Sequence, residues 1–241
     1  LLAYLYFEEL NVDPKQPKKP DRDRLVLSKG HCAPAIYAAL ALKGYFPYEE
    51  LKKLRKIGEM LQGHPDMKGT PGVDMSSGSL GQGISAACGM ALSAKLFGDG
   101  YRVYAILGDG ELEEGQVWEA AMFAAQHQLD HLCVIVDYNG LQIDGRLSEV
   151  CSPEPIDEKF KAFGFEVVSI DAHNLDEIEA AIQQAKTVKG RPFAIIQRSL
   201  KGKGVSFMED NGAWHGSAPN DQQFAQAMEE LNATLAQIKE G

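Results

Sequence analysis

Residues 108–141, from Gly108-Asp109-Gly110 to Asn139-Gly140-Leu141, form the stretch of sequence that decides the fold. The run Tyr101–Leu107 before it is apolar and rich in aromatic and branched side chains, which predicts a short buried parallel strand. Apolar residues then recur at helical spacing from Glu111 to about Gln128, and His131–Val136 is a second strand-like run. A right-handed crossover would bring both glycine-containing loops to one sheet edge, where open α/β sheets bind ligands.

The two loops carry the side chains of a metal-bound diphosphate site. A diphosphate at the start of the helix would meet free backbone N–H groups but also carboxylates, so a cation is needed between the two anionic sets. Asp109 offers a carboxylate, Asn139 an amide oxygen and Leu141 a backbone carbonyl, which are the oxygen ligands of a hard divalent ion. We therefore predict Mg²⁺, or Ca²⁺ or Mn²⁺ in its place, on these three residues, with Gly110 and Glu114 also at the diphosphate.

Taken singly, both loops are ordinary turn sequences, and surface turns of this kind are common. Their pairing at the two ends of one strand–helix–strand unit matches the signature of thiamine-diphosphate enzymes. The sequence Gly-Asp-Gly-Glu-Leu-Glu-Glu-Gly at 108–115 and the sequence Asp-Tyr-Asn-Gly-Leu-Gln-Ile-Asp-Gly at 137–145 resemble transketolase. The resemblance implies thiamine diphosphate as the cofactor.

Further segments extend the resemblance over nearly the whole chain. They are Leu-Ser-Lys-Gly-His at 27–31, Gly-His-Pro at 63–65, Gly-Ser-Leu-Gly-Gln-Gly at 78–83 and Trp-His-Gly at 214–216. A histidine in a turn is by itself usually a polar surface residue. The resemblance implies instead that His31, His64 and His215 are catalytic residues that hold sugar hydroxyls and assist proton transfers, a task that suits the histidine pKa range.

The resemblance also implies cofactor contacts from His31 and His215 and from Gly78, Ser79 and Leu80 of the glycine-rich segment. Without it, this segment is a weak signal, because its glycines do not follow a strand in the dinucleotide-binding manner. One departure concerns Asn211, which stands where some relatives have a lysine that faces the cofactor, and Lys203 is a candidate to replace that lysine. Lys29 could add positive charge near the site.

Short apolar strands alternate with helical patterns along the rest of the chain, which predicts an α/β fold with a doubly wound, mostly parallel sheet and helices on both faces. The length of 241 residues suits one such domain, and the resemblance identifies 1–241 as a single diphosphate-binding domain without a pyrimidine-binding domain. Segments 57–83 and 140–155 are expected to be irregular. The other expected strands are 24–27, 165–170 and 193–197, and the other expected helices are 33–43, 48–56, 84–96, 156–163, 175–187 and one from 218 onward.

Composition excludes several function classes. The formal charge of −10, with no basic patch that interleaves aromatic residues, argues against nucleic-acid binding. No apolar run is long enough to span a membrane and no signal peptide is visible, so we expect a soluble cytoplasmic protein. The four cysteines form no CxxC pair, and Cys88 and Cys133 fall in apolar segments, which favours buried thiols over disulfides or zinc.

The resemblance implies a partner chain. In single-chain transketolases, a second domain supplies the glutamate that activates the cofactor and the arginines that bind substrate phosphate. We therefore expect one half of a split transketolase, active only with a separate pyrimidine-domain subunit, in a heterotetramer of two chains of each kind. Leu1–Leu10 is apolar but lacks a helix start signal, so we expect a chain trimmed at its N-terminus. It and the long loop 57–83 are candidate interface regions.

The expected reaction transfers a two-carbon glycolaldehyde unit from a ketose phosphate to an aldose phosphate, as in the pentose phosphate pathway. Two alternatives remain open at this stage. The chain could serve another thiamine-diphosphate enzyme, such as a transketolase for a branched sugar phosphate or a deoxyxylulose-phosphate synthase. It could also be a non-catalytic module that binds Mg²⁺ and a nucleotide at the same glycine-containing edge.

Overall fold

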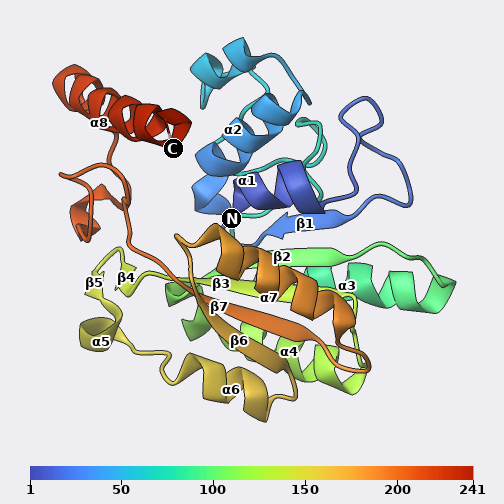
Figure 1. Ribbon diagram of the computed structural model, residues 1–241. Coiled ribbons are helices and arrows are strands. Elements are labelled where there is room, and N and C mark those ends of the chain that lie inside the picture. The colour runs from blue at the N-terminus through green and yellow to red at the C-terminus, as the bar shows by residue number, and fades with distance from the viewer. Residues whose placement is uncertain (241) are drawn as a thin grey trace.

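A central sheet of five parallel strands organises the chain, as seen in a computed structural model that describes residues 1–240 (Figure 1). Its spatial order is β1-β2-β3-β7-β6, and every neighbouring pair in the sheet is parallel. The strands are β1 (Arg24–Leu27), β2 (Val103–Gly108), β3 (Leu132–Tyr138), β6 (Glu166–Asp171) and β7 (Phe193–Arg198). The predicted doubly wound α/β class is confirmed.

Helices cover both faces of the sheet, so the domain has three layers (Figure 1). One face packs against α2 (Ala33–Lys43), α7 (Leu175–Thr187) and the N-terminal helical segment, made of α1 (Leu2–Tyr4) and the π-turn η1 (Leu5–Glu9). The other face packs against α3 (Gln82–Phe97), α4 (Gly115–Gln126) and α6 (Ile156–Ala162).

Alternation along the strands explains why both faces are apolar. Ile135 of β3 belongs to the core that includes α2 and α7, whereas its neighbours Val134 and Val136 belong to the core that includes α3 and α4. Successive side chains of a strand point to opposite faces, so a central parallel strand needs a continuous apolar run to fill two cores. The sheet edge at the carboxyl ends of the strands is therefore held rigidly from both sides.

Three local predictions need correction. Residues 110–113 form the 3₁₀ turn η4 (Gly110–Glu113) instead of the start of a longer helix, and α4 begins only at Gly115. The expected helix 48–56 is the shorter 3₁₀ helix η3 (Tyr48–Lys53), because the backbone becomes extended at Leu54. The connection 140–155 contains a small hairpin of β4 (Leu141–Gln142) and β5 (Gly145–Arg146), followed by α5 (Leu147–Val150).

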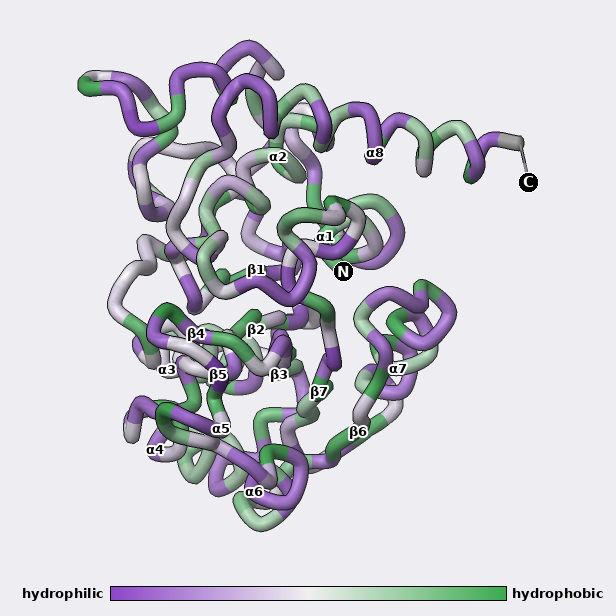
Figure 2. The backbone as a smooth tube through the Cα atoms, turned by 90° about the vertical axis from the view of Figure 1, so that its left-hand side faces the viewer, coloured by the Kyte–Doolittle hydropathy of each residue, from purple (hydrophilic) through white to green (hydrophobic). Residues whose placement is uncertain are grey.

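The remaining elements lie at the ends of strands or outside the sheet. The short 3₁₀ turn η2 (Gly30–Cys32) contains His31, and η5 (Gly212–Trp214) directly precedes His215. The long segment between η3 and α3, which contains His64, has no helix or strand, as predicted. The expected C-terminal helix is α8 (Asp221–Glu240), which lies apart from the sheet (Figures 1 and 2). No helix in the described part of the chain is long and apolar enough to cross a membrane.

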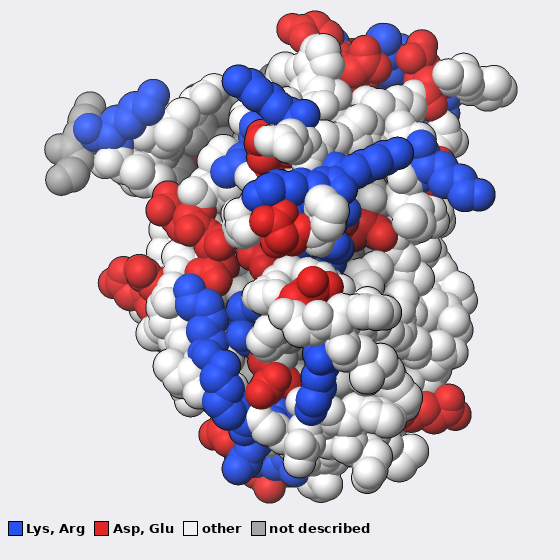
Figure 3. Space-filling model, turned by 90° about the vertical axis from the view of Figure 1, so that its right-hand side faces the viewer, with Lys and Arg blue, Asp and Glu red and all other residues white. Residues whose placement is uncertain are grey.

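Charges on the molecule are mixed in sign. On the face drawn in Figure 3, lysine and arginine side chains alternate with aspartate and glutamate side chains. The four cysteines are free, and Cys88 and Cys133 are buried, as the sequence predicts.

Candidate active site

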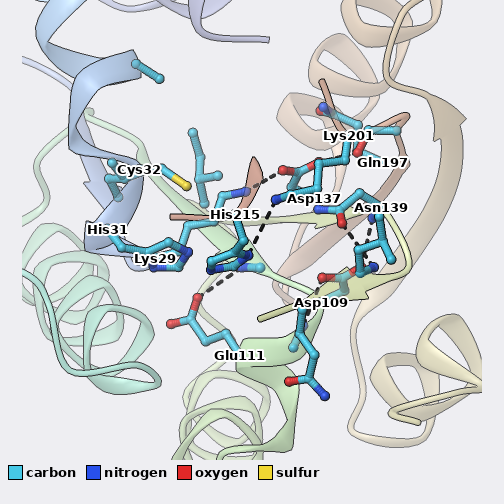
Figure 4. Close-up of a pocket in the computed structure, with 18 of the residues that line it drawn as sticks. Lys29, His31, Cys32, Asp109, Glu111, Asp137, Asn139, Gln197, Lys201 and His215 are labelled. Carbon is cyan, nitrogen blue, oxygen red and sulfur yellow. Dashed lines mark hydrogen bonds and ion pairs between the residues drawn. The ribbon is translucent and has the colours of Figure 1, made fainter. Parts of the chain in front are cut away.

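A cavity of about 860 Å³ opens at the carboxyl ends of the strands. Residues from the ends of β1, β2, β3 and β7 line it, together with the β4–β5 hairpin and the loop that carries η5. This is the edge at which parallel α/β sheets bind ligands. Figure 4 shows 18 of its lining residues, ten of them labelled, around one common space.

Most of the predicted site residues meet in this cavity. Its walls include His31, Gly78, Leu80, Asp109, Gly110, Asn139, Leu141 and His215. Three other predicted residues lie beside the cavity and are not part of its wall. His64 is exposed with its ring near Gly78, so that a Cβ on Gly78 would lie 3.3 Å from that ring, and Ser79 and Glu114 are exposed. The roles of all these residues stay predictions.

The two loops of the central unit are tied together by one carboxylate. Asp109 is only 3% exposed, and its Oδ2 accepts hydrogen bonds from the backbone N–H of Asn139 at 2.8 Å and of Gly140 at 2.6 Å. Its Oδ1 accepts from the N–H of Gly110 at 2.9 Å. Burial raises the pKa of Asp109, and the three N–H groups oppose that rise. The carboxylate thus fixes Asn139 beside it, with two oxygen-bearing side chains in one place (Figure 4).

This donor set fits a hard cation. Within residues 1–240, no group of three or more His, Cys, Asp or Glu side chains could hold a metal ion. A cation here would therefore rest on one carboxylate with amide and carbonyl oxygens, a set that suits Mg²⁺ shared with phosphate oxygens rather than zinc. A positive ion would also relieve the repulsion between Asp109 and the nearby Asp137, which contributes to the raised pKa of Asp109.

A buried ion pair, which the sequence analysis did not predict, lies beside the oxygen atoms of Asp109 and Asn139. Lys29, at the end of β1, contacts the carboxylate of Asp137, which also accepts the hydroxyl hydrogen of Ser199. Burial alone would lower the pKa of Lys29, but the Asp137 carboxylate outweighs it, so that the pKa is raised. The lysine likewise holds the pKa of Asp137 below its usual value despite burial. Lys29 therefore neutralises Asp137 and is not a free positive charge.

A second buried carboxylate, Glu111, braces the glycine-rich segment. It is 2% exposed, contacts the hydroxyl of Ser28, and accepts hydrogen bonds from the N–H of Gly81 at 2.9 Å and of Gly108 at 3.0 Å. Burial raises its pKa. Close packing completes the contact, because a Cβ on Gly83 would lie 2.5 Å from the Ser28 Oγ. Glu111 thus joins three segments that are far apart in the sequence.

His31 and His215 lie against each other in the cavity wall. Their rings stack with centroids 5.2 Å apart and planes inclined by 24°. Burial, with help from His215, Lys29 and Lys201, lowers the pKa of His31 to about 4. Burial also lowers the pKa of His215. Both imidazoles are therefore neutral at pH 7, and a ring nitrogen of each can accept a hydrogen bond from a ligand.

The structure also reveals cavity residues that the motifs did not predict. Lys201 lines the cavity with its Nζ 3.5 Å from His215 Nδ1. Lys203, by contrast, is exposed near Glu209 and is not part of the cavity wall, so the structure gives no support to Lys203 as the replacement for the lysine missing at Asn211. Gln197 of β7 also lines the cavity, is 6% exposed, and its buried Oε1 has no hydrogen-bond partner within the described residues.

The segment Asp171–Asn174 contains another histidine, and its sequence predicts that Asp171 begins a turn and that His173 and Asn174 form a helix cap, rather than a catalytic dyad of Asp171 with His173. Its backbone N–H donates to Asp171, and Asn174 caps α7 by accepting from two backbone N–H groups, which agrees with that expectation. The His173 ring nevertheless lines the cavity, and its Nε2 accepts from the N–H of Leu200 at 2.9 Å.

Comparisons with known proteins show which family the chain belongs to. Residues 2–237 match the family described as "Transketolase, thiamine diphosphate binding domain". The chain is 52% identical over 231 residues to the 6-deoxy-6-sulfo-D-fructose transketolase subunit SqwG of a Clostridium species, a match that covers 96% of this chain and 84% of the relative. It is 37% identical to an apulose-4-phosphate transketolase subunit of Phocaeicola vulgatus, covering 99% of this chain and 85% of that protein.

A solved structure agrees with these matches. Transketolase from Campylobacter jejuni superposes with a TM-score of 0.89 at 35% sequence identity, and the match covers 96% of this chain but only 37% of that one. The chain thus spans little more than a third of a single-chain transketolase and most of the length of the two subunits. These matches place it among transketolase enzymes. The chain belongs to the transketolase family as its N-terminal, thiamine diphosphate binding part, as the sequence resemblance predicts.

Proposed function

We propose that this chain is the N-terminal subunit of a two-chain transketolase that transfers a two-carbon glycolaldehyde unit from a ketose to an aldose. One observation carries the proposal: side chains from four strand ends and two distant loops converge in a single cavity, with oxygen donors at Asp109 and Asn139 and neutral imidazoles at His31 and His215. The relatives named as transketolase subunits support a two-chain arrangement.

The strand-end residues would hold the cofactor. Asp109, Asn139 and the carbonyl of Leu141 would bind Mg²⁺, which in turn binds the diphosphate, while Gly110, Gly78 and Leu80 would contact the cofactor itself. Thiamine diphosphate supplies, when bound, an electron sink that permits cleavage of a C–C bond next to a carbonyl.

The histidines would act on the sugar. His31 and His215 are neutral at pH 7, so their free ring nitrogens can accept hydrogen bonds from sugar hydroxyls. The proton transfers that the family resemblance implies for them would follow these hydrogen bonds. His64, close to Gly78, would contact the outer part of the sugar. The stacking of His31 on His215 limits ring rotation, which would keep the acceptor atoms in place during transfer.

The preferred sugars would carry an anionic group at the end remote from the carbonyl. Ketose and aldose phosphates are the substrates we expect from the family resemblance, and the name of the 52% identical relative adds a sulfonated ketose to the set to be tested. The partner would be a separate pyrimidine-domain chain, and the assembly a heterotetramer with two copies of each chain.

Calorimetry with thiamine diphosphate tests cofactor binding. We expect binding that requires Mg²⁺, tightens with the partner chain, and weakens more than about 100-fold in Asp109→Ala, since even outer-sphere changes cost about 10–100-fold in metal sites. Asp144→Ala is the matched control, because Asp144 is an exposed aspartate of the neighbouring hairpin outside the cavity wall. Equal losses in both variants, or binding of ATP or NAD in preference to thiamine diphosphate, would contradict the proposal.

Product analysis tests the reaction. Mixing the chain and its partner with a ketose phosphate or a sulfonated ketose, plus an aldose phosphate, should yield products changed by two carbons, and neither chain should act alone. Full activity from this chain by itself would refute the two-chain proposal.

A further inference from the structure

Arg55 is a basic side chain of the cavity wall that the proposed roles leave unused. It lies in the irregular segment after η3, which packs against α2, and it lines the same cavity as His31 and Gly78. Asp109 and Asn139, by contrast, enter the cavity from the strand ends. Arg55 therefore borders the cavity from a different element than the proposed cofactor residues.

Arg55 is distinguished by its lack of partners. The other six of the seven arginines have a carboxylate, a backbone carbonyl or an aromatic ring in contact, but no hydrogen bond, ion pair or ring contact of the Arg55 side chain is found within residues 1–240. The paired arginines are Arg22, Arg24, Arg102, Arg146, Arg191 and Arg198. Arg55 is also exposed, so its guanidinium is open to a ligand that enters from solvent.

The other two basic side chains of the cavity are engaged. Lys29 is paired with Asp137, and the Lys201 Nζ lies 3.5 Å from His215 Nδ1. Arg55 thus offers the guanidinium in this cavity whose hydrogen-bond donors are free. A guanidinium binds a phosphate or sulfonate group through two parallel N–H···O bonds, which a lysine cannot do.

The backbone holds Arg55 in an unusual conformation that places the side chain. Its φ of +61° lies in the left-handed region, which non-glycine residues rarely occupy. Its N–H donates to the carbonyl of Leu61 at 2.8 Å, which closes the loop between these two residues. The guanidinium then crosses Gly63, where a Cβ would lie 3.1 Å from the Arg55 Nε, and this glycine precedes His64. Such strain persists where the surrounding structure enforces it, often at ligand sites.

We propose that Arg55 binds the terminal anionic group, phosphate or sulfonate, of the sugar substrate. The inference rests on the proposed transketolase function and adds to it a substrate contact made by this chain, besides the phosphate-binding arginines that the resemblance assigns to the partner. Arg55 is in this sense a specificity residue, because it favours sugars with a remote anion over neutral sugars of the same length.

Paired substrates test the contact in the reconstituted two-chain enzyme. In Arg55→Gln, the KM for a ketose phosphate and for a sulfonated ketose should rise about 10- to 100-fold, because a hydrogen bond to a charged group contributes about one to two decades in affinity. The kcat values and the KM for the neutral ketose should not change. Arg55→Lys should fall between wild type and Arg55→Gln. Lys56→Gln, which removes the adjacent positive charge outside the cavity wall, should match wild type. If Arg55→Gln raises the KM of only one of the two anionic ketoses, the anionic group of that ketose is the ligand.

Equal changes for neutral and anionic sugars, or no change in Arg55→Gln, would overturn the inference while leaving the transketolase function intact. A wild-type complex that transfers from no ketose would instead overturn the proposed function. In that case, NMR of arginine Nε–H signals during titration of the folded chain with inorganic phosphate or sulfate decides the inference. A saturable shift of the Arg55 signal, assigned by its loss in Arg55→Lys, supports the site, and an unmoved signal overturns it.

Discussion

The Lys29–Asp137 ion pair makes a quantitative prediction about stability. Their side chains are only 11% and 26% exposed, and Asp137→Asn removes the negative charge while it keeps the shape and an acceptor for Ser199. Lys29 would then be a buried charge without a counter-ion. Removing one partner of such a pair lowers the free energy of unfolding by about 3–5 kcal/mol, and the partial exposure of Asp137 favours the lower end, about 3 kcal/mol. For a chain of this length that lowers Tm by roughly 6–12 °C.

The assay is thermal and urea unfolding of the chain at pH 7, followed by circular dichroism. Asp210→Asn is the matched control, because Asp210 pairs with Arg146 at 2.7 Å on the surface, where both side chains are about half exposed and such pairs contribute little. Adding Lys29→Met to Asp137→Asn should recover part of the loss, since no buried charge then remains. A Tm of Asp137→Asn that equals that of Asp210→Asn would refute the reasoning.

Three further predictions concern the same edge of the sheet. Because the pKa of His31 falls from 6.5 to about 4, the unfolded chain binds a proton between these values that the folded chain does not, so stability should fall as pH drops from 6.5 to 4. His31→Gln should flatten that slope in urea unfolding at pH 7 and 5, and an unchanged slope would contradict the assignment. Gly83→Ala should destabilise by about 1–3 kcal/mol because its Cβ would strike Ser28, whereas Gly89→Ala, in open space on the same helix, should stabilise by about 0.5–1 kcal/mol. Glu111→Leu should cost about 3 kcal/mol or more by leaving two buried N–H groups without acceptors, and a loss below about 1 kcal/mol in calorimetric unfolding would argue against its bracing role.

Local patterns are enough to predict the parts of the site that are local in sequence. Asp109 and Asn139 each follow an apolar strand directly, and parallel pairing of β2 with β3 brings them to one place. The same logic places His31 after β1. The sheet, its class and its helical layers are likewise readable, because the strands are continuous apolar runs and the helices carry apolar faces.

Contacts that depend on distant pairing are not readable from the sequence. Lys29 and Asp137 are 108 residues apart, and Glu111 reaches Ser28 across 83 residues. Acidic residues are typical of helix starts, which favours Glu111 as the first residue of a helix, yet the chain forms a 3₁₀ turn there that directs this side chain inward. The predicted helix 48–56 is wrong for a similar reason, since the chain must reverse at Arg55 to close its loop onto Leu61.

The strand order has a consequence for synthesis of the chain on the ribosome. β7 is the last strand to be made, yet it lies between β3 and β6, which have no direct pairing with each other. Until residues near 198 have emerged, β6 therefore lacks a neighbour and β3 presents an open edge. Between the synthesis of β6, which ends at Asp171, and that of β7, which ends at Arg198, the nascent protein therefore has two unpaired strand edges that are prone to wrong association. A chaperone that binds extended apolar segments would act in that interval, and the cofactor cavity can close only after it ends.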